Sequence, residues 1–479
     1  MNVNRKIDVC VIGAGISGLS TAFFLKQAGK RVVIFERQPR VGGVIVTERA
    51  NDYLFEHGPN STLATSEKLS ELIRRLDLQD AVCEANSEAA NRYILRDNRL
   101  RRVPLKPNEL LSSDLLSRRA RLRVIGELFV PAKKDAAQET VAEFVQRRLG
   151  REFLDYVINP FVAGVYAGDP AKLNIKAAFR KVYELERQHG GLIRGAIVKM
   201  RQKKRGHTAD KSRAAMFSYK TGMKTLPEHL AEHLQDELFT QVEVLQIRPL
   251  DGRFELQCRF EDNHYFSVQA REVVVASPAY VAASLVADFA PETSAALEAI
   301  PYAPVAVVFS LYNRADVRHP LNGFGFLVPQ VERREILGCI WSSSLFPGRA
   351  PANTVALTTF IGGTRQPELM KKSDDGLLQL AHREVKDLLN VQGPPILQKV
   401  RRWPRAIPQY VQGHLERVRT IRQLEARQPG LYFTGNYLEG ISVADCVETG
   451  WKTAQRMLLR ESGASAAKTA SKQKIEVAS

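Results

Sequence analysis

A glycine-rich turn near the start of the chain constrains the fold more than any other feature. The segment KIDVCVIGAGISGLSTAFFLKQAGKRVVIFER predicts a strand, a tight turn, a helix and a second strand. The turn contains G-x-G-x-x-G, in which the first glycine makes the turn and the second lets backbone approach a pyrophosphate. Glu36 ends the second strand about 20 residues later, where a carboxylate can accept both hydroxyl protons of a ribose. This spacing predicts a dinucleotide-binding unit.

Glycines elsewhere in the chain indicate which dinucleotide is bound. The Gly42–Gly43 doublet in RQPRVGG and Gly58 in FEHGPNS allow a second stretch of backbone to pass close to a cofactor. Near the other end, LYFTGNYLEGISVADCVETGWKTAQRML predicts a strand, a glycine turn and a helix from near Ser442, whose N-terminus can face a flavin ring or its phosphates. This arrangement resembles the amine-oxidase-like FAD flavoproteins, which hold their flavin with elements from both chain ends. The resemblance implies FAD.

The middle of the chain predicts two further regions. At 479 residues, two or three domains are expected. Strands at 240–247 and 271–280 with a hairpin at 253–268 return the chain to the dinucleotide unit. Between about 300 and 415, β-rich stretches predict an antiparallel sheet with a pocket, followed by an amphipathic helix on four apolar residues. Those residues are Leu378, Ala381, Val385 and Leu388. The last 19 residues, 461–479, are small and polar and predict a disordered tail.

The stretch from about 100 to 205 is expected to be helical and basic. TVAEFVQRRLG has Thr140 and Glu143 at capping-box spacing and stops at Gly150. Residues 201–213 predict a solvated loop. Four arginines lie close together, which makes contact with a membrane surface a hypothesis for this region. They are Arg118, Arg119, Arg121 and Arg123.

Composition narrows the classes of function. Lys and Arg number 69 and Asp and Glu 52, so the formal net charge is +17, which favours a phosphate cofactor, an acidic substrate or a lipid surface. The basic clusters lack interleaved aromatic residues, so no nucleic-acid partner is expected. No apolar run approaches the roughly 18 residues of a spanning helix, and no signal peptide is recognised. These features predict a cytoplasmic, peripherally membrane-associated chain.

Neither a metal site nor a disulfide framework is predicted. The five cysteines are scattered, as expected for a reducing compartment. His229, Glu232 and His233 form H-x-x-E-H, an inverted zinc-protease pattern. The surrounding TLPEHLAEHLQDEL is an ordinary amphipathic helix, so we expect no metal ion there.

Several stretches together resemble the protoporphyrinogen oxidases, FAD enzymes of late haem synthesis. They follow the family's order over most of the chain: GAGISGL, FEHGPNS, NRYIL, INPFVAGVYAGDP, PYAPVAVV, GFGFLVP, LGCIWSSSLFP, RWPRAIPQY and GNYLEGISVADCVETG. The resemblance implies a mixed α/β and α+β fold of three parts. These are a split Rossmann-like FAD-binding domain (1–90, 225–300 and 415–460), an antiparallel-sheet substrate domain (91–100, 206–224 and 301–414) and a helical membrane-associating domain (101–205).

The resemblance also implies a reaction and its partners. FAD would oxidise protoporphyrinogen IX to protoporphyrin IX in a six-electron process, with O2 as acceptor and hydrogen peroxide as product. A peripheral membrane surface, a hand-off to ferrochelatase and a homodimer are further expectations. No side chain stands out as a general base, so no catalytic residue is nominated and hydride transfer is assigned to the flavin N5.

Site residues follow from the matching motifs. Arg92 matches the arginine that pairs with a substrate propionate, and Leu327 and Phe346 match apolar walls that sandwich the tetrapyrrole. A macrocycle with carboxylates on its rim needs apolar faces and one orienting cation, which agrees with these assignments. The expected cofactor contacts are Gly13, Ala14, Gly15, Ile16, Ser17, Gly18, Glu36, Arg37, Gly42, Gly43, Val44, Gly58, Pro59, Asn60, Ser61, Val242, Val244, Trp403, Gly435, Asn436, Ile441, Ser442 and Val443.

The stretch INPFVAGVYAGDPAKL is interpreted as a loop between the helical region and the substrate pocket. Gly164 and Gly168 would let its backbone lie close to a flat macrocycle, and its apolar residues would keep the site dry. A buried structural turn is the alternative interpretation.

Other functions stay open from the sequence. Coproporphyrinogen III, which has two more propionates, would suit the same scaffold as a substrate. An FAD amine oxidase or carotenoid-type desaturase is a second class, although GNYLEGISVADC lacks the paired aromatics of an amine cage. A membrane or haem-trafficking adaptor that retains FAD structurally is a third.

Overall fold

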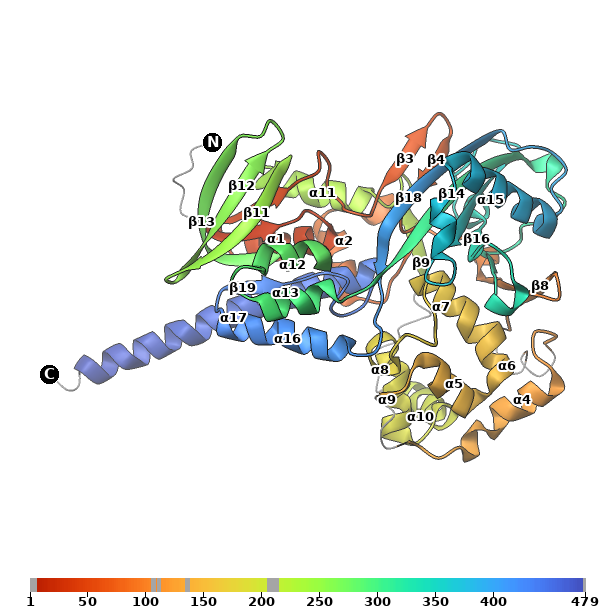
Figure 1. Cartoon of the computed structure of the whole chain (residues 1–479), viewed down its shortest axis with the longest axis horizontal. Coiled ribbons are helices and arrows are strands. Elements are labelled where there is room, and N and C mark those ends of the chain that lie inside the picture. The colour runs from red at the N-terminus through yellow and green to blue at the C-terminus, as the bar shows by residue number, and fades with distance from the viewer. Residues whose placement is uncertain (1–6, 105–108, 110–112, 134–137, 205–214, 477–479) are drawn as a thin grey trace.

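The structure, a computed structural model, describes residues 7–104, 109, 113–133, 138–204 and 215–476. Figure 1 shows two sheet-containing lobes side by side, with a group of helices beside the second lobe. Segments from both ends of the chain meet in the first lobe, where the first helix packs against the long C-terminal helix. The predicted fold class is confirmed, with one largely parallel sheet and one largely antiparallel sheet.

The first sheet has seven strands in the order β10-β2-β1-β13-β12-β11, with β19 beside β13. Strands β10, β2, β1, β13 and β19 run parallel, whereas β11, β12 and β13 form an antiparallel meander. The parallel strands are near-continuous apolar runs, as expected where both faces of a sheet are covered. The bounds are β1 (Ile7–Ile12), β2 (Val32–Glu36), β10 (Leu238–Thr240), β11 (Val242–Leu250), β12 (Arg253–Phe260), β13 (Tyr265–Val275) and β19 (Leu431–Phe433).

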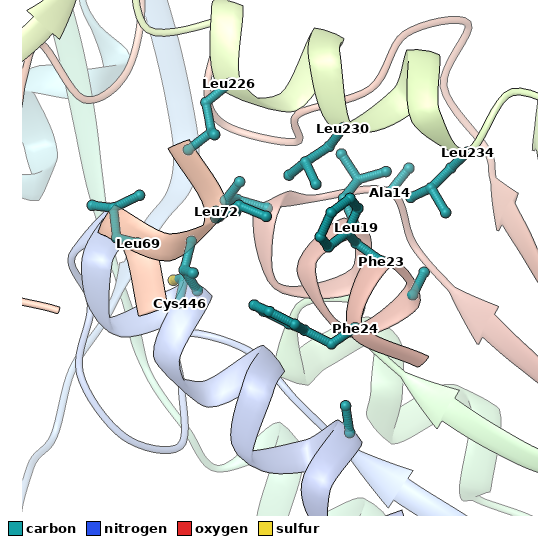
Figure 2. Packing of buried hydrophobic residues seen from close by; sticks show 14 of the residues in the cluster. Ala14, Leu19, Phe23, Phe24, Leu69, Leu72, Leu226, Leu230, Leu234 and Cys446 are labelled. Carbon is teal, nitrogen blue, oxygen red and sulfur yellow. The ribbon is translucent and has the colours of Figure 1, made fainter. Parts of the chain in front are cut away.

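Helices cover both faces of this sheet. On one face α1 is buried from Ile16 to Leu25, which requires apolar neighbours on every side. Figure 2 shows Leu19, Phe23 and Phe24 of α1 between residues of α11, α2 and α17. The other face is covered by α12, α13 and α16. The bounds are α1 (Ile16–Gln27), α2 (Glu67–Arg75), α11 (Thr225–His233), α12 (Ala279–Val286), α13 (Pro291–Glu298), α16 (His414–Arg427) and α17 (Val443–Glu476).

The second sheet also has seven strands, in the order β18-β14-β17-β16-β15-β7-β8. All neighbours are antiparallel except β15 and β7. The predicted amphipathic helix is α15 (Asp374–Leu389), which packs on this sheet through Leu377, Leu380 and Val385. The bounds are β7 (Tyr93–Arg96), β8 (Arg99–Arg102), β14 (Tyr302–Asn313), β15 (Gly325–Leu327), β16 (Gly338–Ile340), α14 (Ser342–Leu345), β17 (Thr354–Gly362) and β18 (Leu397–Pro408).

Two small sheets connect the lobes. The hairpin β3–β4 ends at Glu56, immediately before the predicted cofactor contacts, and β9 pairs with both β5 and β6. Residues 206–214 of the predicted substrate domain lie outside the described residues, as does most of the loop predicted at 201–213. The bounds are β3 (Thr47–Ala50), β4 (Tyr53–Glu56), β5 (Thr62–Leu63), β6 (Val82–Glu84) and β9 (Met216–Tyr219).

A helical lobe occupies the region that the sequence predicts to be helical. The capping box on α5 forms as predicted, with Thr140 Oγ1 accepting the Glu143 N–H and the Glu143 carboxylate accepting the Thr140 N–H. Among the described residues, no helix is long and apolar enough to cross a bilayer. The bounds are α4 (Arg118–Ile125), α5 (Val141–Leu149), α6 (Arg151–Phe153), α7 (Asn159–Tyr166), α8 (Ile175–Ala178), α9 (Arg180–His189) and α10 (Leu192–Lys204).

The interpretation of INPFVAGVYAGDPAKL as a loop is wrong for its first half. Residues 159–166 form α7, which continues from a π-helical turn, Leu154–Ile158. Pro160 lies in the first turn, where a missing N–H costs nothing, and the helix ends with Ala167 in the left-handed region at φ 48°. The glycine within the helix is accepted because α7 packs closely on β15 there.

The predicted disordered tail also differs from the structure. Helix α17 runs from Val443 to Glu476, so residues 461–476 continue the helix, and residues 477–479 lie outside the described part. The stretch ESGASAAKTASKQKIE contains many good helix formers, and extending an existing helix requires no new nucleus.

Candidate functional site

The glycine turn lies at the carboxyl edge of the first sheet. Gly13 has φ 107°, and a Cβ on Gly18 would lie 2.1 Å from the Gly13 carbonyl oxygen, so side chains are excluded at both positions. Helix α1 begins at Ile16 with no side-chain cap and no acid in its first turn. A Cβ on Gly15 would meet no described atom within 4 Å. The N–H groups of Ile16 and Ser17 are therefore available to a phosphate group.

Glu36 stands at the same edge, at the end of β2. It is 8% exposed, and its Oε2 accepts the Ala14 N–H at 2.8 Å while Oε1 accepts the Gln38 N–H at 2.8 Å. These two bonds fix the carboxylate beside the glycine turn and leave lone pairs that ribose hydroxyls could use. Arg37, the neighbouring predicted contact, is exposed.

The second predicted stretch of backbone lies directly against the glycine turn. The Gly42 N–H donates to the Ala14 carbonyl at 2.8 Å, and a Cβ on Gly43 would lie 3.4 Å from the Gly15 Cα. A Cβ on Gly58 would lie 2.0 Å from the Val44 carbonyl oxygen, which places the two glycine-containing segments side by side. Val44 is 43% exposed even though it sits between these segments.

The second sheet reaches this cluster through one tryptophan. Trp403 on β18 donates from Nε1 to the His57 carbonyl oxygen at 2.7 Å, just before Gly58, Pro59, Asn60 and Ser61. Asn60 donates from Nδ2 to the Gly58 carbonyl oxygen at 3.2 Å. The bond from Trp403 therefore links the substrate sheet to the predicted cofactor contacts.

The C-terminal half of the predicted site follows β19. Gly435 has φ 147°, and the Asn436 carbonyl accepts a hydrogen bond from the Tyr410 hydroxyl at 2.5 Å. Ser442 and Asp445 form a reciprocal cap at the start of α17, so α1 offers more free donors to phosphates than α17 does. The other predicted contacts here, Ile441 and Val443, are half-buried and buried respectively. Val242 and Val244 on β11 are buried in the core of the same lobe.

Two residues that the sequence reasoning missed lie at this edge. Ser277 follows β13 and Thr434 follows β19, and the hydroxyl of each is buried without a hydrogen-bond partner among the described residues. Ser277 is beside the glycine turn, because a Cβ on Gly13 would lie 3.4 Å from the Ser277 N. A serine or threonine directly after a buried parallel strand is the signal that could have found them.

These observations fit FAD. The open uncapped turn, the fixed Glu36 carboxylate and the two unpartnered hydroxyls surround the crevice at the carboxyl ends of parallel strands, where α/β folds bind dinucleotides. Gly13 to Ser17 would hold the phosphates, Glu36 the ribose, and the segments around Gly43 and Asn60 the flavin side. When bound, FAD supplies the electron acceptor for a two-electron oxidation.

The structure brings four of the five predicted substrate residues together in two pairs, Arg92 with Phe346 and Leu327 with Gly164. Gly168 joins neither pair. Arg92 lies over the ring of Phe324 at 5.4 Å, and Phe324 packs with the buried Phe346. Leu327 on β15 faces α7, because a Cβ on Gly164 would lie 2.6 Å from Leu327 Cδ2. Both pairs border β15. Gly168 instead packs beside Gln409 and Leu173.

Arg92 has no ion-pair partner among the described residues, and its guanidinium lies over the aromatic ring of Phe324, which packs with Phe346. Its backbone carbonyl accepts the Val103 N–H, which fixes the strand but leaves the guanidinium free to meet a carboxylate. The arrangement can therefore orient an acidic, apolar ligand.

A buried charged pair lies between the two halves of the site. Glu56 ends β4 and Arg349 follows α14; both are less than 5% exposed, and their Oε1 and Nη1 atoms are 3.5 Å apart. They share a small cavity with Asn60 and Phe346. Burial raises the pKa of Glu56 to about 7, against the opposing effects of Thr47 and Arg349. The sequence reasoning nominated neither residue.

The metal prediction can be checked at the H-x-x-E-H pattern. His229 and His233 lie on α11, and the Nδ1 atom of each approaches the carbonyl oxygen four residues earlier, at 3.0 and 2.9 Å. No cluster of three metal-ligating side chains occurs among the described residues.

Comparisons with known proteins agree with this geometry. The chain matches the family described as flavin containing amine oxidoreductase over residues 16–458. It is 35% identical over 474 residues to the chloroplastic protoporphyrinogen oxidase of Oryza sativa subsp. japonica, which covers 94% of this chain and 88% of the relative. It is 28% identical over 462 residues to the coproporphyrinogen III oxidase of Bacillus subtilis (strain 168), covering 93% of this chain and 96% of the relative.

A solved structure shows the same fold. The crystal structure of a candidate protoporphyrinogen oxidase from Exiguobacterium sp. 255-15 superposes with a TM-score of 0.78 at 23% identity, covering 95% of this chain and 99% of the other. The family match spans most of the chain, and the site fits the cofactor of that family. The chain therefore belongs to the flavin-containing amine oxidoreductases and, within them, to the protoporphyrinogen oxidase family of FAD-dependent oxidoreductases.

Proposed function

We propose that the chain catalyses the FAD-dependent six-electron oxidation of protoporphyrinogen IX to protoporphyrin IX, with O2 as acceptor and hydrogen peroxide as product, in haem biosynthesis. The observation that carries the proposal is the 35% identity to a protoporphyrinogen oxidase over 94% of the chain. The unpaired Arg92 guanidinium beside the Phe324 ring supports the proposal, because a porphyrinogen carries carboxylates on the rim of an apolar ring.

The chain's own residues would bind, orient and shield the substrate. Arg92 pairs with a propionate and fixes which edge of the macrocycle enters first. Leu327 and Phe346 cover its faces and exclude water, and the backbone of α7 approaches closely because Gly164 has no side chain. No described side chain is assigned as a base for the first bond cleavage.

Anaerobic flavin reduction tests the proposal. We expect the flavin absorbance of the purified enzyme to bleach on mixing with protoporphyrinogen IX without oxygen, and to recover with hydrogen peroxide formation when oxygen is admitted. Bleaching with a polyamine but not with a porphyrinogen would contradict the proposal in favour of an amine oxidase. Failure of every porphyrinogen to bleach the flavin would favour a non-enzymatic adaptor.

Coproporphyrinogen III is the second candidate substrate, favoured by the similarity to the Bacillus subtilis enzyme. The same assay with both porphyrinogens, read as kcat/KM from porphyrin fluorescence, separates the two. A higher kcat/KM for coproporphyrinogen III would overturn our first choice of substrate while retaining the reaction type. Hand-off of the product to ferrochelatase and a homodimer stay predictions.

We also infer that the helical lobe contacts a membrane surface. Five large apolar side chains of this lobe are exposed, on or next to α4 and on α10, and their exposed fractions are 69%, 44%, 85%, 40% and 61%. They are Leu122, Ile125, Phe129, Ile197 and Met200. The arginines of α4 lie on the same segment as three of them, which suits an anionic lipid surface.

A further inference from the structure

Glu56 and Arg349 form a buried ion pair that three other segments of the chain hold in place. Glu56 Oε2 accepts the Thr47 hydroxyl at 2.6 Å, and Oε1 accepts the Met223 N–H at 2.8 Å. The Nη2 of Arg349 donates to the Ser218 hydroxyl at 2.6 Å. The pair is therefore held from β3, β9 and the turn before α11, and both side chains are almost fully buried.

Arg349 in turn holds the predicted apolar wall. Its guanidinium lies over the Phe346 ring at 5.2 Å from the ring centroid, three residues earlier in the chain. Its carbonyl oxygen accepts the Leu54 N–H at 3.2 Å, which ties this segment back to the strand that carries Glu56. Because both partners are almost fully buried, the position of the guanidinium depends on a compensating negative charge.

Glu56 supplies that charge and also lies close to the predicted cofactor contacts. It is four residues before Asn60, and Glu56, Arg349, Asn60 and Phe346 line one small cavity. The Nη1 atom of Arg349, which faces Glu56, has no hydrogen-bond partner among the described residues. The contact across this cavity is thus electrostatic and depends on the ionisation of Glu56.

The charges around the pair decide how easily Glu56 takes up a proton. Burial raises its pKa to about 7, and Arg349 and Lys224 act in the opposite direction. Burial also lowers the pKa of Arg349, an effect that Glu56 and Cys83 oppose and Arg49 reinforces. A group with this pKa changes its charge in the range where the enzyme would work.

We propose that Glu56 is a positioning residue for the tetrapyrrole: ionised Glu56 anchors Arg349, Arg349 holds the Phe346 ring in place, and protonation of Glu56 releases this wall and weakens binding of the macrocycle. The inference rests on the proposed function, because it takes a porphyrinogen as the ligand. It requires no electron or group transfer at Glu56, only the gain or loss of one proton.

The pH dependence of KM tests the inference. In the wild-type holoenzyme we expect the KM for porphyrinogen to fall as the pH rises through about 7, with a smaller change in kcat. In Glu56→Gln the KM should stay at every pH at the high value that wild type has at low pH. At pH 8 this is about tenfold above wild type. Gln can still bond Thr47 and Met223, so the variant removes mainly the charge. A variant whose KM follows the wild-type profile would overturn the inference.

A matched control is available in Glu272→Gln. Glu272 is another buried carboxyl with a pKa raised by burial, and its partners are Tyr432 and Arg460. This variant should keep the wild-type pH dependence of KM. If Glu272→Gln also abolished that dependence, the effect would not be specific to Glu56. If Glu56→Gln fails to fold, Glu56→Asp serves instead and should retain the pH dependence with a shifted midpoint.

Equilibrium binding and a double-mutant cycle separate this inference from the proposed function. The Kd of protoporphyrin IX, measured by fluorescence quenching without turnover, should follow the same pH dependence as KM and lose it in Glu56→Gln. Adding Glu56→Gln to Phe346→Leu should raise the Kd less than it does in wild type, because the ring that it positions is already absent. Full additivity would overturn the inference, whereas absent turnover with intact pH-dependent binding would overturn only the proposed reaction.

Discussion

Two buried carboxylates at strand ends have different surroundings and therefore different tasks. Glu36 accepts two backbone N–H groups, which do not titrate and hold the carboxylate in one place. Glu56 accepts one backbone N–H and one hydroxyl, and the Arg349 guanidinium pairs with it at 3.5 Å without a hydrogen bond, so its charge is compensated less completely. At the scale of single residues, the first arrangement suits a fixed contact with a cofactor and the second suits a group that responds to pH.

The stability of the protein should reflect this difference at Glu56. Burial raises its pKa from the ordinary 4.5 to about 7 in the folded state, so the folded state binds the proton more tightly. The stabilisation is fully present below pH 4.5 and is lost as the pH rises through about 7. Raising the pH from about 5 to about 8 should therefore lower the free energy of unfolding of wild type by about 3 kcal/mol relative to Glu56→Gln.

Thermal unfolding midpoints of both proteins, taken at the two pH values and at one fixed FAD concentration, measure this effect. Parallel changes in the two proteins would show that Glu56 titrates near its ordinary pKa.

Arg92 gives a second prediction at this scale. Arg92→Ala should raise the KM for protoporphyrinogen IX by about tenfold and change kcat less, because the guanidinium orients a carboxylate and does not react. Arg99→Ala, an exposed arginine in the same hairpin, is the control and should leave both constants near wild type. Steady-state kinetics with both variants decide the matter, and an unchanged KM in Arg92→Ala would remove Arg92 from the site.

At the scale of elements, α7 shows why a sequence pattern can mislead. Its proline and glycine are typical of a loop, but Pro160 occupies the first turn and Gly164 faces Leu327. Arg365 bonds the Asn159 and Val328 carbonyl oxygens and holds the start of the helix against the second sheet. These tertiary contacts override the weak local propensity.

The contact between α7 and β15 can be tested by adding one methyl group. Gly164→Ala should change the unfolding midpoint little, because better helix propensity, worth about 1 kcal/mol, offsets the shift of the Leu327 side chain. Displacing Leu327 should nevertheless raise the KM for porphyrinogen. Gly126→Ala, where a Cβ meets no described atom within 4 Å, should leave the KM near wild type. An unchanged KM in Gly164→Ala would show that Leu327 does not line the substrate site.

The helical lobe depends on a buried ion network. Arg148 is fully buried and donates to Glu127 at 2.6 Å and to Glu186 at 2.8 Å, while Glu127 also accepts the N–H groups that open α10. Arg148→Met leaves two buried carboxylates without their central cation and should destabilise the protein by about 3–5 kcal/mol. Arg151→Met, which removes a surface pair with Asp155, should cost less than about 1 kcal/mol. Comparable losses in chemical denaturation of the two variants would refute the role of the network.

Local motifs were predictable from the sequence, and long-range partnerships were not. The glycine turn, Glu36 and the capping box at Thr140 each lie within one short segment, so their spacing alone predicts the geometry. Glu56 and Arg349 are nearly 300 residues apart, and no spacing rule relates them. The unpartnered hydroxyls of Ser277 and Thr434 likewise acquire meaning only once the parallel strands align.

At the scale of the whole molecule, the candidate site depends on several separate segments that converge. The N-terminal turn and the C-terminal strand lie on one sheet, while β15, α7 and the end of β7 come from the second sheet and the helical lobe. The bond from Trp403 to His57 and the pair formed by Glu56 and Arg349 connect these parts. The proposed site therefore draws on residues from both sheets and from α7 of the helical lobe.

The proposed membrane contact of the helical lobe gives the last prediction. The formal net charge is +17, and the helical lobe exposes Leu122 and Phe129 beside the arginines of α4. The protein should therefore bind vesicles that contain anionic lipids, and binding should weaken as salt screens the charges while the apolar contribution remains. Leu122→Ser and Phe129→Ser should each reduce binding about threefold or more at fixed salt, because each removes apolar area from the interface.

Leu459→Ser is the matched control for Leu122→Ser. Leu459 is also 69% exposed and helical, but it belongs to α17, which runs from the first lobe away from the helical lobe in Figure 1. Co-sedimentation should show wild-type binding for this variant. Equal losses of binding in Leu459→Ser and Leu122→Ser would show that any exposed apolar side chain contributes. Equal binding of the wild type to anionic and zwitterionic vesicles would show that the arginines do not contribute. A loss of binding confined to variants of the helical lobe, and sensitive to salt, would support the proposed membrane contact of this lobe.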